Sequence, residues 1–170
     1  MYSTPIDLGE TTVSGFGSIS EEIQVPNSIP SGAHTIVAFG VNPDGDEHIV
    51  SMGVVLDNDG PEITSITVSQ STVAPGDTFT ITIDANDPSG ITYVGFSFSV
   101  NGAQRDFCGQ NISRTSGTDT NGTWTRQCTV PASVIGGTYT ITPFAADTLQ
   151  NYTNTNCCSS SPARATFMVQ

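Results

Sequence analysis

The sequence has no lysine, and its four arginines face sixteen acidic residues, which gives a net charge of −12. A surface of this charge repels nucleic acid and anionic membranes, so we expect no nucleic-acid partner and no membrane insertion. The same surface attracts cations, above all calcium. The missing lysine also excludes isopeptide cross-links between lysine and asparagine side chains, because the chain has no amine to supply.

Strong helix formers are scarce as well, since leucine occurs only three times and lysine never. Threonine, serine, glycine, valine and isoleucine dominate, which favours strands and turns and predicts almost no helix. No apolar run approaches the roughly 18 residues that a membrane-spanning helix needs. The stretch "MYSTPIDLGE" lacks the basic segment and apolar core of a signal peptide, so we expect any export signal to lie outside this chain.

Motifs of catalysis are absent too. The sequence contains no GxSxG and no HExxH pattern, and we therefore predict that the protein is not an enzyme. The four cysteines form no CxxC pair, which argues against zinc and favours disulfides in an exported protein.

An internal repeat is present at an offset of 105 residues without a gap. Residues 13–46 align with residues 118–151, and apolar positions and turn residues coincide along the whole length. Each copy predicts a strand, a turn at Val-Pro, a strand, an acidic loop and a further strand. The first copy has only a short segment before the repeat begins. We therefore predict a partial module over residues 1–58 that lacks its first strands, and a complete domain over residues 59–170.

Two segments of the second copy alternate apolar and polar residues, as half-buried strands do. In "TFTITIDA" the residues on one face are Phe79, Ile81, Ile83 and Ala85, and in "TYVGFSFSV" they are Val94, Phe96, Phe98 and Val100. About seven short strands separated by turns rich in Gly, Pro, Asn and Asp predict an all-β fold, an antiparallel β-sandwich.

The runs "DNDGPEITSITVSQSTVAPGDTFTITIDANDPSGI" and "GTYTITPFAADTLQN" resemble tandem bacterial immunoglobulin-like domains of secreted or cell-surface repeat proteins. The resemblance covers residues 60–170 well, and residues 1–59 as the latter half of a related module. It implies an immunoglobulin-like sandwich and an extracellular or cell-surface location. It also implies a structural or adhesive role, because such domains occur in adhesins, stalks, fibres and as spacers of secreted enzymes.

In an immunoglobulin-like sandwich the segments "DNDGP", "DANDPSG" and "AADTLQN" lie at one end of the fold. Calcium binds six to eight oxygen atoms from Asp, Asn, backbone carbonyls and water. A calcium site there is similar to the calcium-bridged linkers of cadherins, and the alternative is that these residues are ordinary solvated turns. The expected ligands are Asp57, Asp59, Asp87 and Asp147, with Asn58, Asn86 and Asn151 as helpers.

All four cysteines are disulfide candidates. Cys128 aligns with Ile23, a core position of the repeat, so we expect its side chain to point inward. A bond between Cys108 and Cys128 is the first choice. Cys157 and Cys158 are left either to bond to each other or to pair with the first two, and four cysteines allow three connectivities.

Three functional hypotheses remain open at this point. The first is a non-catalytic structural or adhesive module of a surface stalk, adhesin or fibre, rigidified by calcium at the linker and contacting neighbouring domains of its kind. The second is a self-assembling filament subunit whose incomplete first module is completed by strands from a neighbouring chain. The third is an accessory domain of a secreted hydrolase that binds a surface protein or a glycan.

Overall fold

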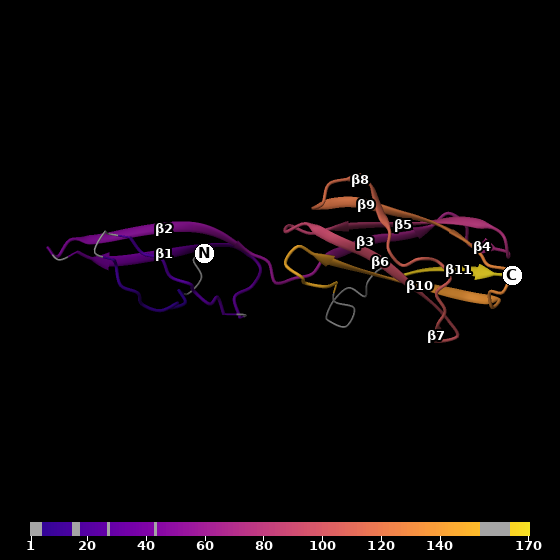
Figure 1. The fold of residues 1–170 in the computed structure, drawn as a ribbon, viewed down its shortest axis with the longest axis horizontal. Helices are drawn as coiled ribbons and strands as arrows, with labels where there is room; N and C mark the ends of the chain where they lie inside the picture. Colours follow the sequence, from indigo (N-terminus) through magenta and orange to yellow (C-terminus); the bar gives the residue numbers. More distant parts are fainter. Residues whose placement is uncertain (1–4, 15–17, 27, 43, 154–163) are drawn as a thin grey trace. The chain divides into compact units, whose positions relative to one another are not determined.

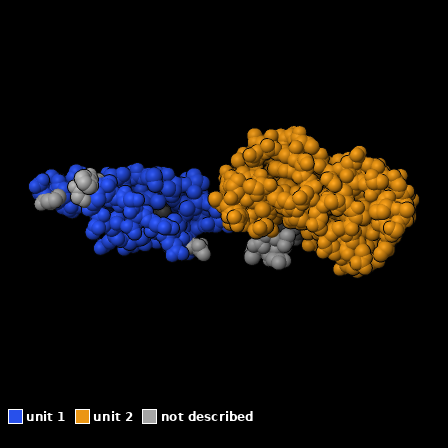
Figure 2. All heavy atoms as spheres, viewed as in Figure 1, with its two compact units in different colours: residues 1–58 blue, residues 59–170 orange. Residues whose placement is uncertain are grey.

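The computed structural model describes residues 5–14, 18–26, 28–42, 44–153 and 164–170. The chain divides into two compact units, residues 1–58 and residues 59–170 (Figure 2). The described residues form strands and turns without a helix, which confirms the predicted all-β fold. Among them, accordingly, no helix is suited to crossing a membrane.

The second unit is a sandwich of two sheets (Figure 1). One sheet has the strand order β4-β11-β10-β6-β7 and the other β3-β5-β9-β8. Neighbouring strands are antiparallel, except that β4 and β11 are parallel. The predicted antiparallel sandwich is therefore confirmed. Its strands are β3 (Glu62–Val68), β4 (Thr72–Val73), β5 (Thr78–Asn86), β6 (Ile91–Val100), β7 (Ala103–Gln104), β8 (Ser113–Gly117), β9 (Asn121–Thr129), β10 (Gly137–Asp147) and β11 (Ala165–Val169).

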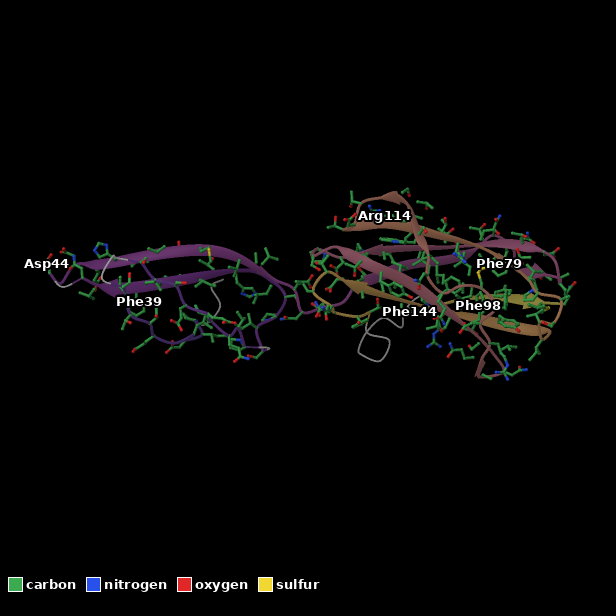
Figure 3. The ribbon with its side chains drawn as sticks, viewed as in Figure 1. Phe39, Asp44, Phe79, Phe98, Arg114 and Phe144 are labelled. Carbon is green, nitrogen blue, oxygen red and sulfur yellow. A yellow bond between two sulfur atoms is a disulfide. The ribbon has the colours of Figure 1, made fainter. Side chains whose placement is uncertain are left out.

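The core of the second unit follows from the period of two in its strands. Each second residue of β5 and β6 points between the sheets, away from water. β9 contributes Trp124 and Cys128 to the same core. A group of aromatic rings fills the centre, and Figure 3 labels two of them, Phe79 and Phe98. The buried hydrophobic residues of β5 and β6 are Phe79, Ile81, Ile83, Ala85, Ile91, Val94, Phe96, Phe98 and Val100.

The first unit contains an antiparallel hairpin of β1 (Gly32–Val41) and β2 (Glu47–Leu56). The repeat predicts a further strand around Ile23, but the described residues 18–26 include none, and Ile19 and Ile23 are exposed. Strand pairing explains this difference between the two copies. Cys128, the counterpart of Ile23 in the repeat, lies on β9 opposite Phe79 of β5. The described part of the first unit has no strand equivalent to β5, so this segment has no ladder to join.

Candidate metal centre

The turn after β5 is built around Asp87, whose side chain is only 3% exposed. Its Oδ1 accepts three hydrogen bonds, from the backbone N–H of Ser89 (2.9 Å), the Ser89 hydroxyl (2.6 Å) and the backbone N–H of Gly90 (3.1 Å). Gly90 has φ +96°, a value that favours glycine. All hydrogen bonds to the Asp87 carboxylate from described residues therefore end on one oxygen, and Oδ2 takes none.

The turn after β10 is built in a similar way around Asp147, which is 2% exposed. Oδ1 accepts from the backbone N–H groups of Leu149 (2.9 Å) and Asn151 (2.7 Å). Oδ2 accepts from the side-chain amide of Asn151 at 2.8 Å. Asn151 therefore orients the carboxylate of Asp147.

Thr148 joins the two turns. Its backbone N–H donates to the carbonyl of Gly90 (2.9 Å), and its hydroxyl donates to the carbonyl of Ser89 (2.8 Å). These bonds bring the two carboxylates together, so that an oxygen of Asp87 and an oxygen of Asp147 lie within 4.8 Å of each other. Two oxygens bound to one calcium ion are at most about 5 Å apart, since each lies 2.3–2.6 Å from the ion.

The segment that begins the second unit lies against the second of these turns. A Cβ atom on Gly60 would be only 2.1 Å from the carbonyl oxygen of Tyr152, so the two backbones are in direct contact. One residue further on, the hydroxyl of Thr153 donates to the carbonyl of Pro61 at 3.0 Å. The beginning of β3 is therefore fixed beside Asn151 and the Asp147 turn.

Within the described residues, neither buried carboxylate forms an ion pair. The ion pair found among the described residues joins Arg114 to Asp119 on the surface (Figure 3 labels Arg114). Arg105 instead donates to the backbone carbonyl of Gln104. In the part of the chain that the structure describes, the carboxylates of Asp87 and Asp147 thus accept hydrogen bonds from neutral donors alone.

The other predicted ligands and helpers do not belong to the two turns of Asp87 and Asp147. Asp59 is the first residue of the second unit and is exposed, and Asp57 directly follows β2 in the first unit. Of the predicted helpers, Asn58 donates to the carbonyl of Ile29. Asn86 donates to Glu62 (3.2 Å).

Two of the predicted disulfide cysteines are bonded, since Cys108 and Cys128 form a disulfide with their Cα atoms 5.6 Å apart. This confirms the first choice, and Cys128 is 1% exposed as expected. The bond connects the segment that follows β7 and precedes β8 to β9. Cys157 and Cys158 lie outside the described residues.

Sequence reasoning missed Ser89 and Thr148, which hold the two turns together. Ser89 follows Asp87 closely enough for its hydroxyl to reach that carboxylate, which is a local signal, but the bond from the Thr148 hydroxyl to the carbonyl of Ser89 spans 59 residues and has none.

Residues 61–142 match the family model of a bacterial Ig domain. The match begins at Pro61, one residue before β3, and ends within β10. No curated protein was found to match the chain.

Proposed function

We propose that this chain, whose second unit belongs to the bacterial Ig domain family, is a non-catalytic module of an exported surface protein that is stiffened by calcium. Bacterial Ig domains are generally structural or adhesive modules. The disulfide between Cys108 and Cys128 supports an extracellular or cell-surface location, because disulfides persist in oxidising compartments.

The observation that carries the calcium proposal is the pair of buried carboxylates, Asp87 and Asp147. At 4.8 Å, two unit charges repel by about 3 kcal/mol at an effective dielectric constant of 20. A divalent cation between them converts this repulsion into attraction. Oδ2 of Asp87 is the oxygen that the turn leaves for such an ion, because the hydrogen bonds of the turn end on Oδ1.

The segment leading into the second unit supplies the further ligands in this proposal. Gly60 is held against Tyr152, and a chain extends at most about 3.6 Å per residue. Gly60 is thus a fixed point beside the Asp147 turn. Asp59 precedes it by one residue and Asp57 by three, so the length of the chain limits how far each can lie from that turn. Backbone carbonyls and water complete the six to eight oxygen ligands of calcium.

The functional consequence is mechanical. An ion bound by the two turns and by the leading segment restricts the backbone that connects this Ig domain to the residues before it. Calcium then acts as a stiffener of the linker, as a repeat protein of a stalk or adhesin requires.

Calcium titration of the full chain tests the proposal, followed by calorimetry and by thermal unfolding. We expect saturable binding and a rise in Tm of about 5–10 °C at calcium concentrations near 100 times Kd. Asp87→Asn should abolish both responses, because it removes a ligand while keeping Oδ1. Asp44→Asn, which removes one negative charge from an exposed turn of the first unit, is the matched control and should respond like the wild type.

Absence of binding heat and of a Tm shift at millimolar calcium would exclude the site. An equal loss of the response in Asp44→Asn would also contradict it, because it would show that net charge rather than the Asp87 turn attracts the ion.

A further inference from the structure

The hairpin of the first unit exposes an apolar face. Opposite residues of paired strands share a face, and so do alternate residues of each strand. By the register of β1 and β2, Val37, Phe39 and Val41 lie on the same face as Ile49 and Val55. These side chains are between 55% and 85% exposed, with Phe39 the most exposed (labelled in Figure 3). We name these five residues the hairpin face.

The opposite side of the hairpin also exposes Val50 (69%) and Met52 (60%), but it differs because part of it is covered. His34, Ile36 and Val54 lie there and are half-buried. The ring of His34 hydrogen-bonds through Nε2 to the carbonyl of Pro30 at 2.8 Å, in the segment that precedes β1. The hairpin face has no comparable cover among the described residues.

A two-stranded hairpin is at best marginally stable in water, and exposed apolar patches of this kind mark association sites. We propose that the hairpin face binds the hairpin face of a second copy of this chain, in a two-fold symmetric dimer. A two-fold interface needs only one self-complementary patch. This inference is independent of the calcium site.

The area of the hairpin face suits such a dimer. Its five side chains expose roughly 600 Å² of surface, so two copies bury roughly 1,200 Å², the lower limit for a specific interface. This area lies below that of obligate dimers, which bury roughly 2,000 Å² or more, so we expect a dimer that dissociates on dilution.

Charge selects the orientation of the two copies. Half of the sixteen acidic residues and none of the four arginines lie within residues 1–58. Asp44, Asp46 and Glu47 gather at the hairpin tip, where Glu47 lies opposite Val41, while the five residues of the hairpin face are uncharged. With the strands of the two copies antiparallel, the two tips are separated by a strand length of about 33 Å, several times the Debye length at physiological salt. A parallel arrangement would bring the two acidic tips together.

The mass of the full chain in solution, measured by light scattering and sedimentation at up to about 100 μM, tests the dimer. We expect a concentration-dependent dimer in the wild type. Phe39→Thr and Ile49→Thr should each weaken dimerisation at least ten-fold, while threonine preserves the strand. Val50→Thr is the matched control, because Val50 is the next residue of β2, is 69% exposed against 71% for Ile49, and lies on the opposite side. It should dimerise like the wild type.

A second measurement does not depend on substitutions. In a sample that mixes isotope-labelled and unlabelled chains, the antiparallel dimer predicts intermolecular NOEs between the ring of Phe39 and the methyl groups of Val55. A monomeric wild type, open-ended assemblies, equal weakening by Val50→Thr, or contacts between the two Phe39 rings in place of Phe39 with Val55 would each overturn the proposal.

Discussion

Asp87 and Asp147 present carboxylate oxygens within 4.8 Å of each other, although both side chains are almost completely buried. Each carboxylate organises its own turn through backbone N–H groups. Hydrogen bonding therefore accounts for each aspartate, and the bonds of Thr148 hold the two turns side by side, but these bonds do not offset the repulsion between the two carboxylates. Their proximity has an energetic cost in the absence of a cation, and this cost makes the pair testable without a ligand.

Asp87→Asn should raise the free energy of unfolding when calcium is removed by a chelator, by about 1–3 kcal/mol. The substitution keeps the acceptor Oδ1 with its three hydrogen bonds and replaces Oδ2 by an amide that donates toward Asp147. In saturating calcium the order should reverse, with the wild type the more stable. Urea unfolding under the two conditions measures both values.

Asp87→Ala serves as the control for the turn itself. It removes the acceptor of all three bonds, so it should be less stable than Asp87→Asn in both conditions. If Asp87→Asn and Asp87→Ala lower the free energy of unfolding equally in the chelator, the aspartate is needed only for the turn. That result would contradict a repulsion between Asp87 and Asp147.

Much of the fold of the second unit could be predicted from its sequence, because the period of its strands reports burial directly. Phe79, Ile81, Ile83 and Ala85 alternate with polar residues, and each is at most 1% exposed. Alternation marks such positions whenever a strand has one face in the core. The acidic turns of Asp87 and Asp147 could be placed at one end of the sandwich from the resemblance to immunoglobulin-like domains, which implies the order of the strands.

In the first unit, the pattern of apolar residues does not predict which segments form strands. Ile23 occupies the same place in the repeat as Cys128, yet it is 41% exposed, whereas Cys128 is buried. A side-chain pattern states what a segment prefers, but a strand forms only beside another strand. The hydrogen bonds of the candidate site could not be predicted from the sequence either. The sequence does not show that Asn86 bonds to Glu62, or that Asn151 bonds to Asp147.

The disulfide should contribute about 3 kcal/mol to the stability of the second unit, because it closes a loop with a sequence separation of 20 residues. Replacing Cys108 and Cys128 together by alanine should lower the free energy of unfolding by this amount, measured in urea. Replacing Cys157 and Cys158 instead provides a matched removal of two cysteines. If the Cys108/Cys128 double variant loses less than about 1 kcal/mol, the loop is already restricted in the unfolded chain.

Gly95 should not tolerate a side chain. It lies on β6 beneath the ring of Phe144, which stacks on Tyr93 with ring centroids 5.7 Å apart. A Cβ atom on Gly95 would be 2.7 Å from Cε2 of Phe144 and 2.9 Å from the hydroxyl oxygen of Tyr93. Gly95→Ala should therefore lower the free energy of unfolding by about 1–3 kcal/mol through overpacking.

Two variants check this explanation of Gly95. Gly136→Ala, where the nearest atom is at an ordinary 3.5 Å, should be close to neutral. Adding Phe144→Leu to Gly95→Ala should recover part of the loss, because the ring that collides with the new methyl group is gone. Additive losses in the double variant would contradict the predicted clash.

Asp84 should make the second unit sensitive to acid. Hydrogen bonds from the hydroxyls of Ser65 (2.6 Å) and Thr123 (2.7 Å) lower the pKa of its carboxyl group below the usual 3.8, against a smaller opposing effect of burial. A carboxyl group with a lowered pKa binds its proton less readily in the folded state than in the unfolded state. Its stabilisation is therefore complete above pH 3.8 and is lost as the pH falls through the lowered folded-state value.

The free energy of unfolding of the wild type and of Asp84→Asn, measured in urea from about pH 5 to pH 2, checks the sign. The difference between the two proteins should be largest at the upper end of this range and should shrink toward the lower end, because asparagine does not titrate. Ser65→Ala removes one donor and leaves the carboxylate, so the folded-state pKa of Asp84 is lowered less, and the loss of stability should be smaller and should end at a higher pH than in the wild type. A difference that is constant over the range would mean that Asp84 has the same pKa in the folded and unfolded chains, and that its two hydroxyl partners hold the charged and neutral forms equally well.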